Sequence, residues 1–142
     1  MKLYMRILKI VKSVILIVLM FTILAGCSNV PDGISKEMYK NADEISQIIN
    51  VNFENKSHLN EDDKNKVESY IEKITSDNFI TSSDNENLFI MDIYNLYAYY
   101  DFYLLYMSME DDEKILSIKE KYINIRENLK TTYNISFKNT DN

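Results

Sequence analysis

The chain has 142 residues, 46% of them hydrophobic and 12% aromatic, a composition that supports one packed domain. Two glycines and one proline are too few for a turn-rich all-β fold, so helices are favoured. The single cysteine and single histidine exclude a disulfide within the chain and the usual Cys/His zinc sites, and the net charge of −6 disfavours nucleic-acid binding.

The N-terminal segment has the layout of a secretory signal peptide. Four basic residues and no acid precede Cys27, and an apolar run without charge extends from Ser13 to Ala25. The uncharged run to Gly26 has 14 residues, whereas a helix that spans the hydrocarbon core needs about 20, which argues against a retained transmembrane helix. The run ends in the sequence Leu24-Ala25-Gly26-Cys27.

This four-residue ending resembles the lipobox of bacterial lipoprotein precursors. In that family the cysteine thiol receives a diacylglyceryl group, a dedicated signal peptidase cleaves before the cysteine, and the new N-terminus can be acylated. The resemblance covers residues 1–27 and implies a signal peptide over 1–26, cleavage between Gly26 and Cys27, and covalent lipid on Cys27 as the only bound group. The alternative is an incidental or buried cysteine after an ordinary signal peptide.

Lipid on Cys27 would place the mature domain at the extracytoplasmic face of the cell membrane, or at the outer membrane of a Gram-negative host. Two or three acyl chains suffice for stable attachment. From Cys27 onward the chain has 12 basic and 22 acidic residues, a net charge of 12 − 22 = −10. Such a domain is repelled by nucleic acid and by anionic lipid headgroups, so the anchor, over a tether of residues 27–33, is the expected membrane contact.

Two amphipathic patterns begin the helical domain, which is predicted to cover residues 34–133. The first starts near Ser35, a good N-cap, and the second starts at Asn60. Their apolar faces are Met38, Ala42, Ile45, Ile48 and Ile49 in the first pattern and Val67, Tyr70, Ile71 and Ile74 in the second. A polar stretch over 75–85 predicts a loop, with Phe79 and Ile80 against the core.

The third pattern, over 86–109, is apolar on two opposite faces. One face holds Leu88, Met91, Ala98, Phe102, Leu105 and Met109, and the other holds Phe89, Ile93, Leu96, Tyr100, Leu104 and Met107. A helix that is hydrophobic all round is normally buried on all sides. We therefore predict an all-α bundle of about four helices with this tyrosine-rich helix at its centre; Asp92 and Asp101 argue against a membrane helix.

The fourth pattern, over 112–132, has a seam suited to antiparallel packing. Its apolar residues follow in steps of three and four: Ile115, Ile118, Tyr122, Ile125 and Leu129. Residues 134–142 are polar and are predicted to form a frayed tail.

Six tyrosines within the third pattern are the strongest candidate for a functional site. They are Tyr94, Tyr97, Tyr99, Tyr100, Tyr103 and Tyr106. Core packing would bury the rings and lead each hydroxyl to water or to a carbonyl. Alternatively, if three helices cannot cover both faces, Tyr97, Tyr100, Tyr103 and Leu104 would form a surface for a protein partner or for self-association.

Other polar residues give little indication of catalysis. Asp92 and Asp101 are nine residues apart and project to opposite sides of a helix, so they cannot form one catalytic pair. The acidic runs 61–63 and 110–113 lack the spacing of a calcium loop and are interpreted as helix starts. His58 has no second histidine or cysteine beside it and is interpreted as a surface residue.

The sequence therefore favours a noncatalytic, lipid-anchored protein-interaction module that binds a protein of unknown identity and no metal. One alternative is an immunity or exclusion lipoprotein that neutralises a toxin. Another is a carboxylate-based enzyme that acts on the cell wall, for which a cleft flanked by two carboxyl groups would be required.

Overall fold

Four α-helices make up the fold: α2 (Lys36–Glu54), α3 (Glu61–Thr75), α4 (Asp84–Ser108) and α5 (Asp112–Tyr133). The structure is a computed structural model that describes residues 30–76 and 79–137, and this part of the chain contains no strand. The predicted all-α bundle of four helices is confirmed. The signal peptide, Gly26 and Cys27 lie outside the described residues.

Each helix begins at a polar side chain that accepts a hydrogen bond from a backbone amide in the first turn. Ser35 caps α2, Asn60 caps α3, Ser83 caps α4 and Asp111 caps α5. The predicted starts of α2 and α3 are confirmed. Helix α4 begins two residues before the predicted position 86, because the Ser83 hydroxyl accepts from the Glu86 amide at 3.1 Å.

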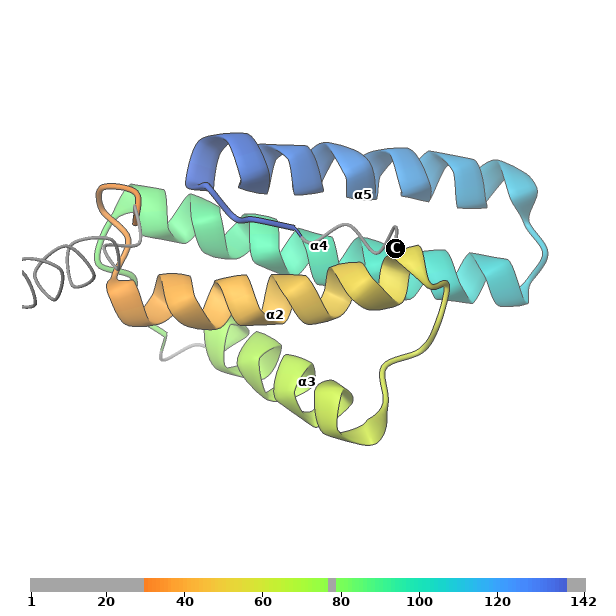
Figure 1. Cartoon of the computed structure of the whole chain (residues 1–142), viewed down its shortest axis with the longest axis horizontal. Helices are drawn as coiled ribbons and strands as arrows, with labels where there is room; N and C mark the ends of the chain where they lie inside the picture. Colours follow the sequence, from red (N-terminus) through yellow and green to blue (C-terminus); the bar gives the residue numbers. More distant parts are fainter. Residues whose placement is uncertain (1–29, 77–78, 138–142) are drawn as a thin grey trace, which may run out of the picture.

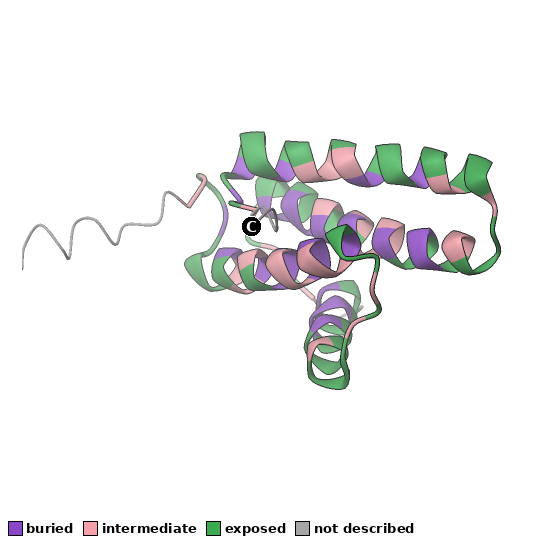
Figure 2. Ribbon diagram, turned by 45° about the vertical axis from the view of Figure 1, so that its right-hand side comes forward, coloured by how far each residue is buried: buried purple, intermediate pink, exposed green. Residues whose placement is uncertain are grey.

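The two long helices α4 and α5 run antiparallel, and α2 packs along α4 and also contacts α5 through side chains (Figure 1). Helix α3 is shorter and packs against α2. Figure 2 shows that the buried positions of all four helices face the interior of this arrangement. The four residues of α3 that were predicted to face inward are all buried: Val67, Tyr70, Ile71 and Ile74.

Pairs of aromatic rings, one stacked and one tilted, join the helices in the core. The rings of Phe53 on α2 and Tyr122 on α5 lie parallel within 11°, with centroids 3.6 Å apart. Toward the other end of the bundle, Phe89 on α4 packs against Tyr133 on α5 with centroids 4.8 Å apart. Such pairs add about 0.5–1.5 kcal/mol each beyond the area they bury.

Burial of α4 on all sides, predicted from its two apolar faces, is wrong. The face of Phe89, Ile93, Leu96 and Tyr100 is buried, but Leu88, Met91, Phe102, Leu105 and Met109 on the other face are exposed. Three partner helices are too few to surround a fourth when α3 packs mainly on α2 rather than on α4. One long side of α4 is consequently left to solvent.

Two predictions about the connecting segments also need correction. Phe79 packs against the core as expected, but Ile80 is 88% exposed. The C-terminal tail is ordered from Asn134 to Phe137: Ile135 is fully buried, and Phe137 is partly buried against the core. Asn134 adopts a left-handed conformation, φ 59°, which turns the chain back toward the bundle after α5.

Candidate functional site

The predicted tether is docked on the domain from Val30 onward. Val30 packs against the core, and the Ser83 hydroxyl donates a hydrogen bond to the carbonyl oxygen of Gly33. The Asn85 amide donates to the carbonyl oxygen of Asp32 at 3.3 Å. Residues 30–33 of the predicted tether thus contact the domain, and Ser28 and Asn29 lie between Cys27 and this segment in the sequence.

The tyrosine face proposed from the sequence is part of the core. Tyr100, Tyr103 and Leu104 are 2%, 4% and 8% exposed, and Tyr97 is half-buried. The Tyr100 hydroxyl donates to the carbonyl oxygen of Ser57 at 2.8 Å, and burial raises its pKa to about 12. Core packing with a hydroxyl directed to a carbonyl is thus the interpretation that fits Tyr100, and of the four residues in the alternative partner face only Tyr97 is partly exposed in this chain.

The uncovered surface is the opposite face of the same helix. We call it the α4 stripe; its members are Leu88, Met91, Tyr94, Ala98, Phe102, Leu105 and Met109. The six large side chains of the stripe are between 44% and 59% exposed. Apart from Tyr94, these positions were predicted from the sequence as one apolar face, but only the packing of α2, α3 and α5 shows that these three helices leave it about half exposed.

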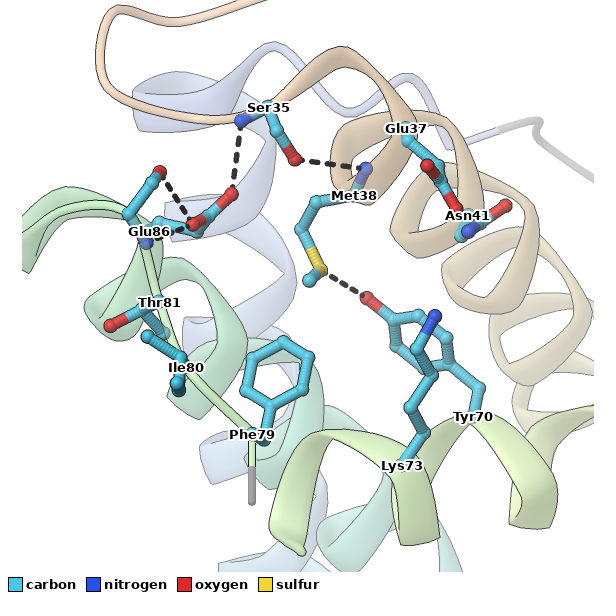
Figure 3. A pocket seen from close by; sticks show the side chains of 11 residues that line it. Ser35, Glu37, Met38, Asn41, Tyr70, Lys73, Phe79, Ile80, Thr81 and Glu86 are labelled. Atoms are coloured by element: carbon cyan, nitrogen blue, oxygen red, sulfur yellow. Dashed lines mark hydrogen bonds between the residues drawn. The ribbon is translucent and has the colours of Figure 1, made fainter.

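A cavity of about 410 Å³ opens between α2, α3 and the segment before α4 (Figure 3). Its walls include the apolar side chains of Met38, Phe79 and Ile80, and the Tyr70 hydroxyl donates to the Met38 sulfur at 3.1 Å. Burial raises the pKa of Tyr70 above its ordinary value. Polar and charged residues complete the lining, so the cavity is mixed in character: Ser35, Glu37, Asn41, Lys73, Thr81, Ser82 and Glu86.

Glu86 is the buried carboxylate at the edge of this cavity, and the sequence analysis missed its role. One carboxylate oxygen accepts from the Ser35 amide at 3.0 Å, and the other accepts from the amide and hydroxyl of Ser82, each at 2.6 Å. Burial alone would raise the pKa of Glu86, but these hydrogen bonds outweigh it and hold the pKa at about 2. The spacing Ser83-x-x-Glu86 is a capping-box pattern that could have indicated this residue.

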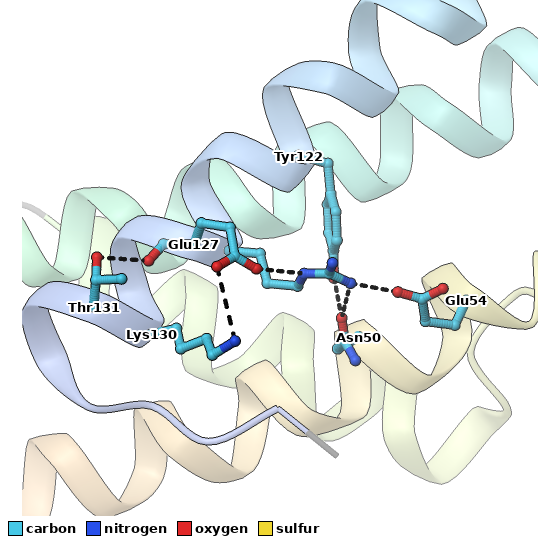
Figure 4. Close-up of polar contacts among 7 residues, drawn as sticks. Asn50, Glu54, Tyr122, Glu127, Lys130 and Thr131 are labelled. Carbon is cyan, nitrogen blue, oxygen red and sulfur yellow. Dashed lines mark hydrogen bonds and ion pairs between the residues drawn. The ribbon is translucent and has the colours of Figure 1, made fainter. Parts of the chain in front are cut away.

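A second polar cluster connects α2 with α5 (Figure 4). Asn50 is 2% exposed, and its side-chain oxygen accepts from the Tyr122 hydroxyl at 3.4 Å and from the Arg126 guanidinium at 3.3 Å. Arg126 also pairs with Glu54 and, at 3.9 Å, with Glu127. These groups satisfy one another, so the cluster fixes how α5 sits on α2.

Asp92 and Asp101, the two acids considered for catalysis, do not form a pair. Asp92 is partly buried, which raises its pKa, and it accepts a hydrogen bond from Asn128 at 2.7 Å. Asp92 is thus a hydrogen-bonded polar position at the edge of the core, whereas Asp101 is exposed. His58 is exposed, and the acidic runs at 61–63 and 110–113 lie at the starts of α3 and α5, as predicted.

Neither a metal site nor a membrane span is found in the described residues. Within 30–76 and 79–137, no group of three or more His, Cys, Asp or Glu side chains is placed to hold a metal ion. None of the helices in these ranges has the length and apolar character needed to cross a membrane. Comparisons with protein-family models, curated proteins and solved structures gave no match to this chain.

Proposed function

We propose that this protein is a lipoprotein held at the extracytoplasmic face of a membrane by lipid on Cys27, with a helical domain that acts as a noncatalytic protein-interaction module. The resemblance of residues 1–27 to lipoprotein precursors supports the anchor. The observation that carries the interaction role is the α4 stripe, a continuous apolar surface along the longest helix.

The stripe is chemically suited to binding a protein. Its large side chains are Leu, Met, Tyr and Phe, and aromatic residues and methionine are enriched at the centres of protein interfaces. Half-exposed side chains of this size present roughly 100 Å² each, because complete burial of an aromatic side chain covers roughly 150–250 Å². Six of them give roughly 600 Å², at the upper end of the apolar patches seen on monomers, and patches of that size commonly mark interaction sites.

The carboxylates support a noncatalytic role. A general acid for glycoside hydrolysis needs a raised pKa and a free position beside the substrate, but Glu86 has a pKa of about 2 and both its oxygens are engaged. Asp92 is turned toward Asn128 of α5, and Asp101 is nine residues further along α4. The cell-wall enzyme is therefore the weaker proposal.

The short tether would keep the domain at the bilayer. Three residue steps separate Cys27 from Val30, where the chain packs on the core, and three extended residues span at most about 10 Å. A domain on such a tether meets other proteins of the same membrane surface more often than proteins in solution.

One experiment in intact bacterial cells tests both halves of this proposal. The full-length chain is labelled with a clickable fatty acid and carries a photoreactive amino acid at Phe102 on the stripe or at Glu120 on the outer side of α5. We expect label on the native chain and none on Cys27→Ser, and protein crosslinks from position 102 at several times the yield from position 120. Label on the Cys27→Ser protein contradicts the anchor, and equal crosslinking from both positions contradicts the docking surface.

A further inference from the structure

The α4 stripe is symmetric in sequence about Ala98. Tyr94 and Phe102 each lie four residues from Ala98, and Met91 and Leu105 each lie seven residues from it. Leu88 lies ten residues before Ala98 and Met109 lies eleven residues after it, so this pair is one position out of register. Aromatic side chains therefore match aromatic ones, long aliphatic side chains match long aliphatic ones, and the smallest residue lies in the middle.

A surface with this pattern is complementary to itself when two copies run in opposite directions. A two-fold symmetric interface is reciprocal: if one residue contacts a second residue of the other copy, the same contact occurs again with the two copies exchanged. Antiparallel α4 helices that cross at Ala98 would bring Tyr94 against Phe102 and Met91 against Leu105 of the other copy. A small side chain at the crossing point allows the two helix axes to approach closely.

We propose that the occupant of the α4 stripe is a second copy of this chain, bound as an antiparallel two-fold dimer about Ala98. This proposal rests on the proposed function and names the partner. The roughly 600 Å² of apolar surface is somewhat below the roughly 800 Å² per partner of a stable interface, so the dimer is weak in dilute solution. Anchoring both copies in one membrane raises their effective concentration and favours the dimer.

Geometry on the membrane is compatible with this dimer. Two copies anchored in the same leaflet are related by a two-fold axis perpendicular to the bilayer, which for antiparallel helices makes α4 lie parallel to the membrane. The acidic domains, each with a net charge of −10 from Cys27 onward, repel one another at low ionic strength. Higher salt should therefore strengthen the dimer.

Cysteine crosslinking of the full-length chain in intact cells tests both the partner and the direction. Met91→Cys and Leu105→Cys are expressed as two differently tagged copies, alone or together, and the membranes are oxidised. We expect the mixed pair to give at least about tenfold more crosslinked dimer than either variant alone, because in the antiparallel dimer identical positions are 14 residues, about 21 Å, apart along the helix axis. Ala98→Cys should crosslink to itself.

Three controls and one disruptive substitution make the result decisive. Glu120→Cys, on the exposed outer side of α5, reports random collisions, and unmodified chain reports any reaction of Cys27. Adding Leu105→Glu to the Ala98→Cys chain should reduce its crosslink about tenfold or more, because a charge would be buried in an apolar interface. Leu116→Glu, at a residue that is 70% exposed on α5, should leave the crosslink unchanged.

The outcomes separate this inference from the proposed function. Crosslinks from Ala98→Cys no stronger than those from Glu120→Cys overturn the dimer, as do equal yields from Met91→Cys alone and from the mixed pair, which indicate parallel packing. If the photoreactive residue at Phe102 then captures a different protein, the interaction module stands and only self-association fails. If it captures nothing, both fail.

Discussion

Glu86 joins two helix starts that are far apart in the chain. It belongs to the first turn of α4, yet one of its oxygens accepts from the amide of Ser35, the N-cap of α2, 51 residues earlier. The other oxygen binds Ser82 just before α4. A buried carboxylate with three donors stabilises the fold only while all three are in place, because an orphaned buried donor is costly.

Replacing Glu86 by Gln should therefore lower the free energy of unfolding by about 1–3 kcal/mol at neutral pH, since the charge-assisted hydrogen bonds are lost. Urea denaturation followed by circular dichroism measures this loss. Glu72→Gln, at an exposed position of α3, is the matched control and should change stability by less than about 0.5 kcal/mol. Equal effects of the two substitutions would show that Glu86 has no special structural role.

The same residue makes stability depend on pH in a defined direction. Its pKa is about 2 in the folded protein, below the ordinary value of 4.5, so the folded state binds fewer protons than the unfolded state between these values. Its contribution is complete above about pH 4.5 and is lost as the pH falls through about 2. The stability difference between the native chain and Glu86→Gln should accordingly be smaller at pH 3 than at pH 7.

Helix α4 has two apolar faces, of which one is buried in the core and the other is about half exposed. Neighbouring residues show the contrast: Leu104 is 8% exposed and lies in the core, whereas Leu105 is 48% exposed and lies on the α4 stripe. Both are leucines in the same helix turn, so helix propensity affects them alike. Any difference between them reports burial.

We expect Leu104→Ala to lower the free energy of unfolding by about 2–4 kcal/mol, because removing a buried leucine leaves a cavity. Leu105→Ala should cost less than about 1 kcal/mol when measured at protein concentrations that keep the chain monomeric. Urea denaturation of the two variants side by side provides the measurement. Equal losses would mean that the stripe is covered within the monomer, contrary to the fold described above.

At the scale of the whole molecule, the segment after α5 closes the bundle. The carbonyl oxygen of Asn134 accepts from the Tyr39 hydroxyl at 3.0 Å, and that of Ser136 accepts from the Gln47 side chain, so the chain end is fastened to α2. Between these contacts, Ile135 is completely buried. The first and last helices of the domain are thereby joined by residues outside any helix.

Replacing Ile135 by Ala should destabilise the domain by about 2–3 kcal/mol, although the residue lies in a segment without secondary structure. Ser136→Ala is the control, because it keeps the carbonyl oxygen that accepts from Gln47 and removes only an exposed hydroxyl. Thermal unfolding of both variants measures the difference. A loss below about 0.5 kcal/mol for Ile135→Ala would show that the tail does not contribute to the closed bundle.

Local signals in the sequence determined the four helices of this protein. The caps at Ser35 and Asn60 and the steps of three and four from Ile115 to Leu129 concern residues that are close in the chain, so the pattern predicts the element directly. The lipobox at Cys27 is local as well and remains a prediction from sequence.

Only the tertiary structure decided which apolar surfaces are covered. Both faces of α4 read as core, and the choice between them depended on how α2, α3 and α5 distribute around it, which involves residues tens of positions apart. The burial of Ile135 and the link from Glu86 to Ser35 are equally nonlocal. Sequence patterns report the tendency of a side chain to be buried, whereas burial itself depends on whether another element is available to cover it.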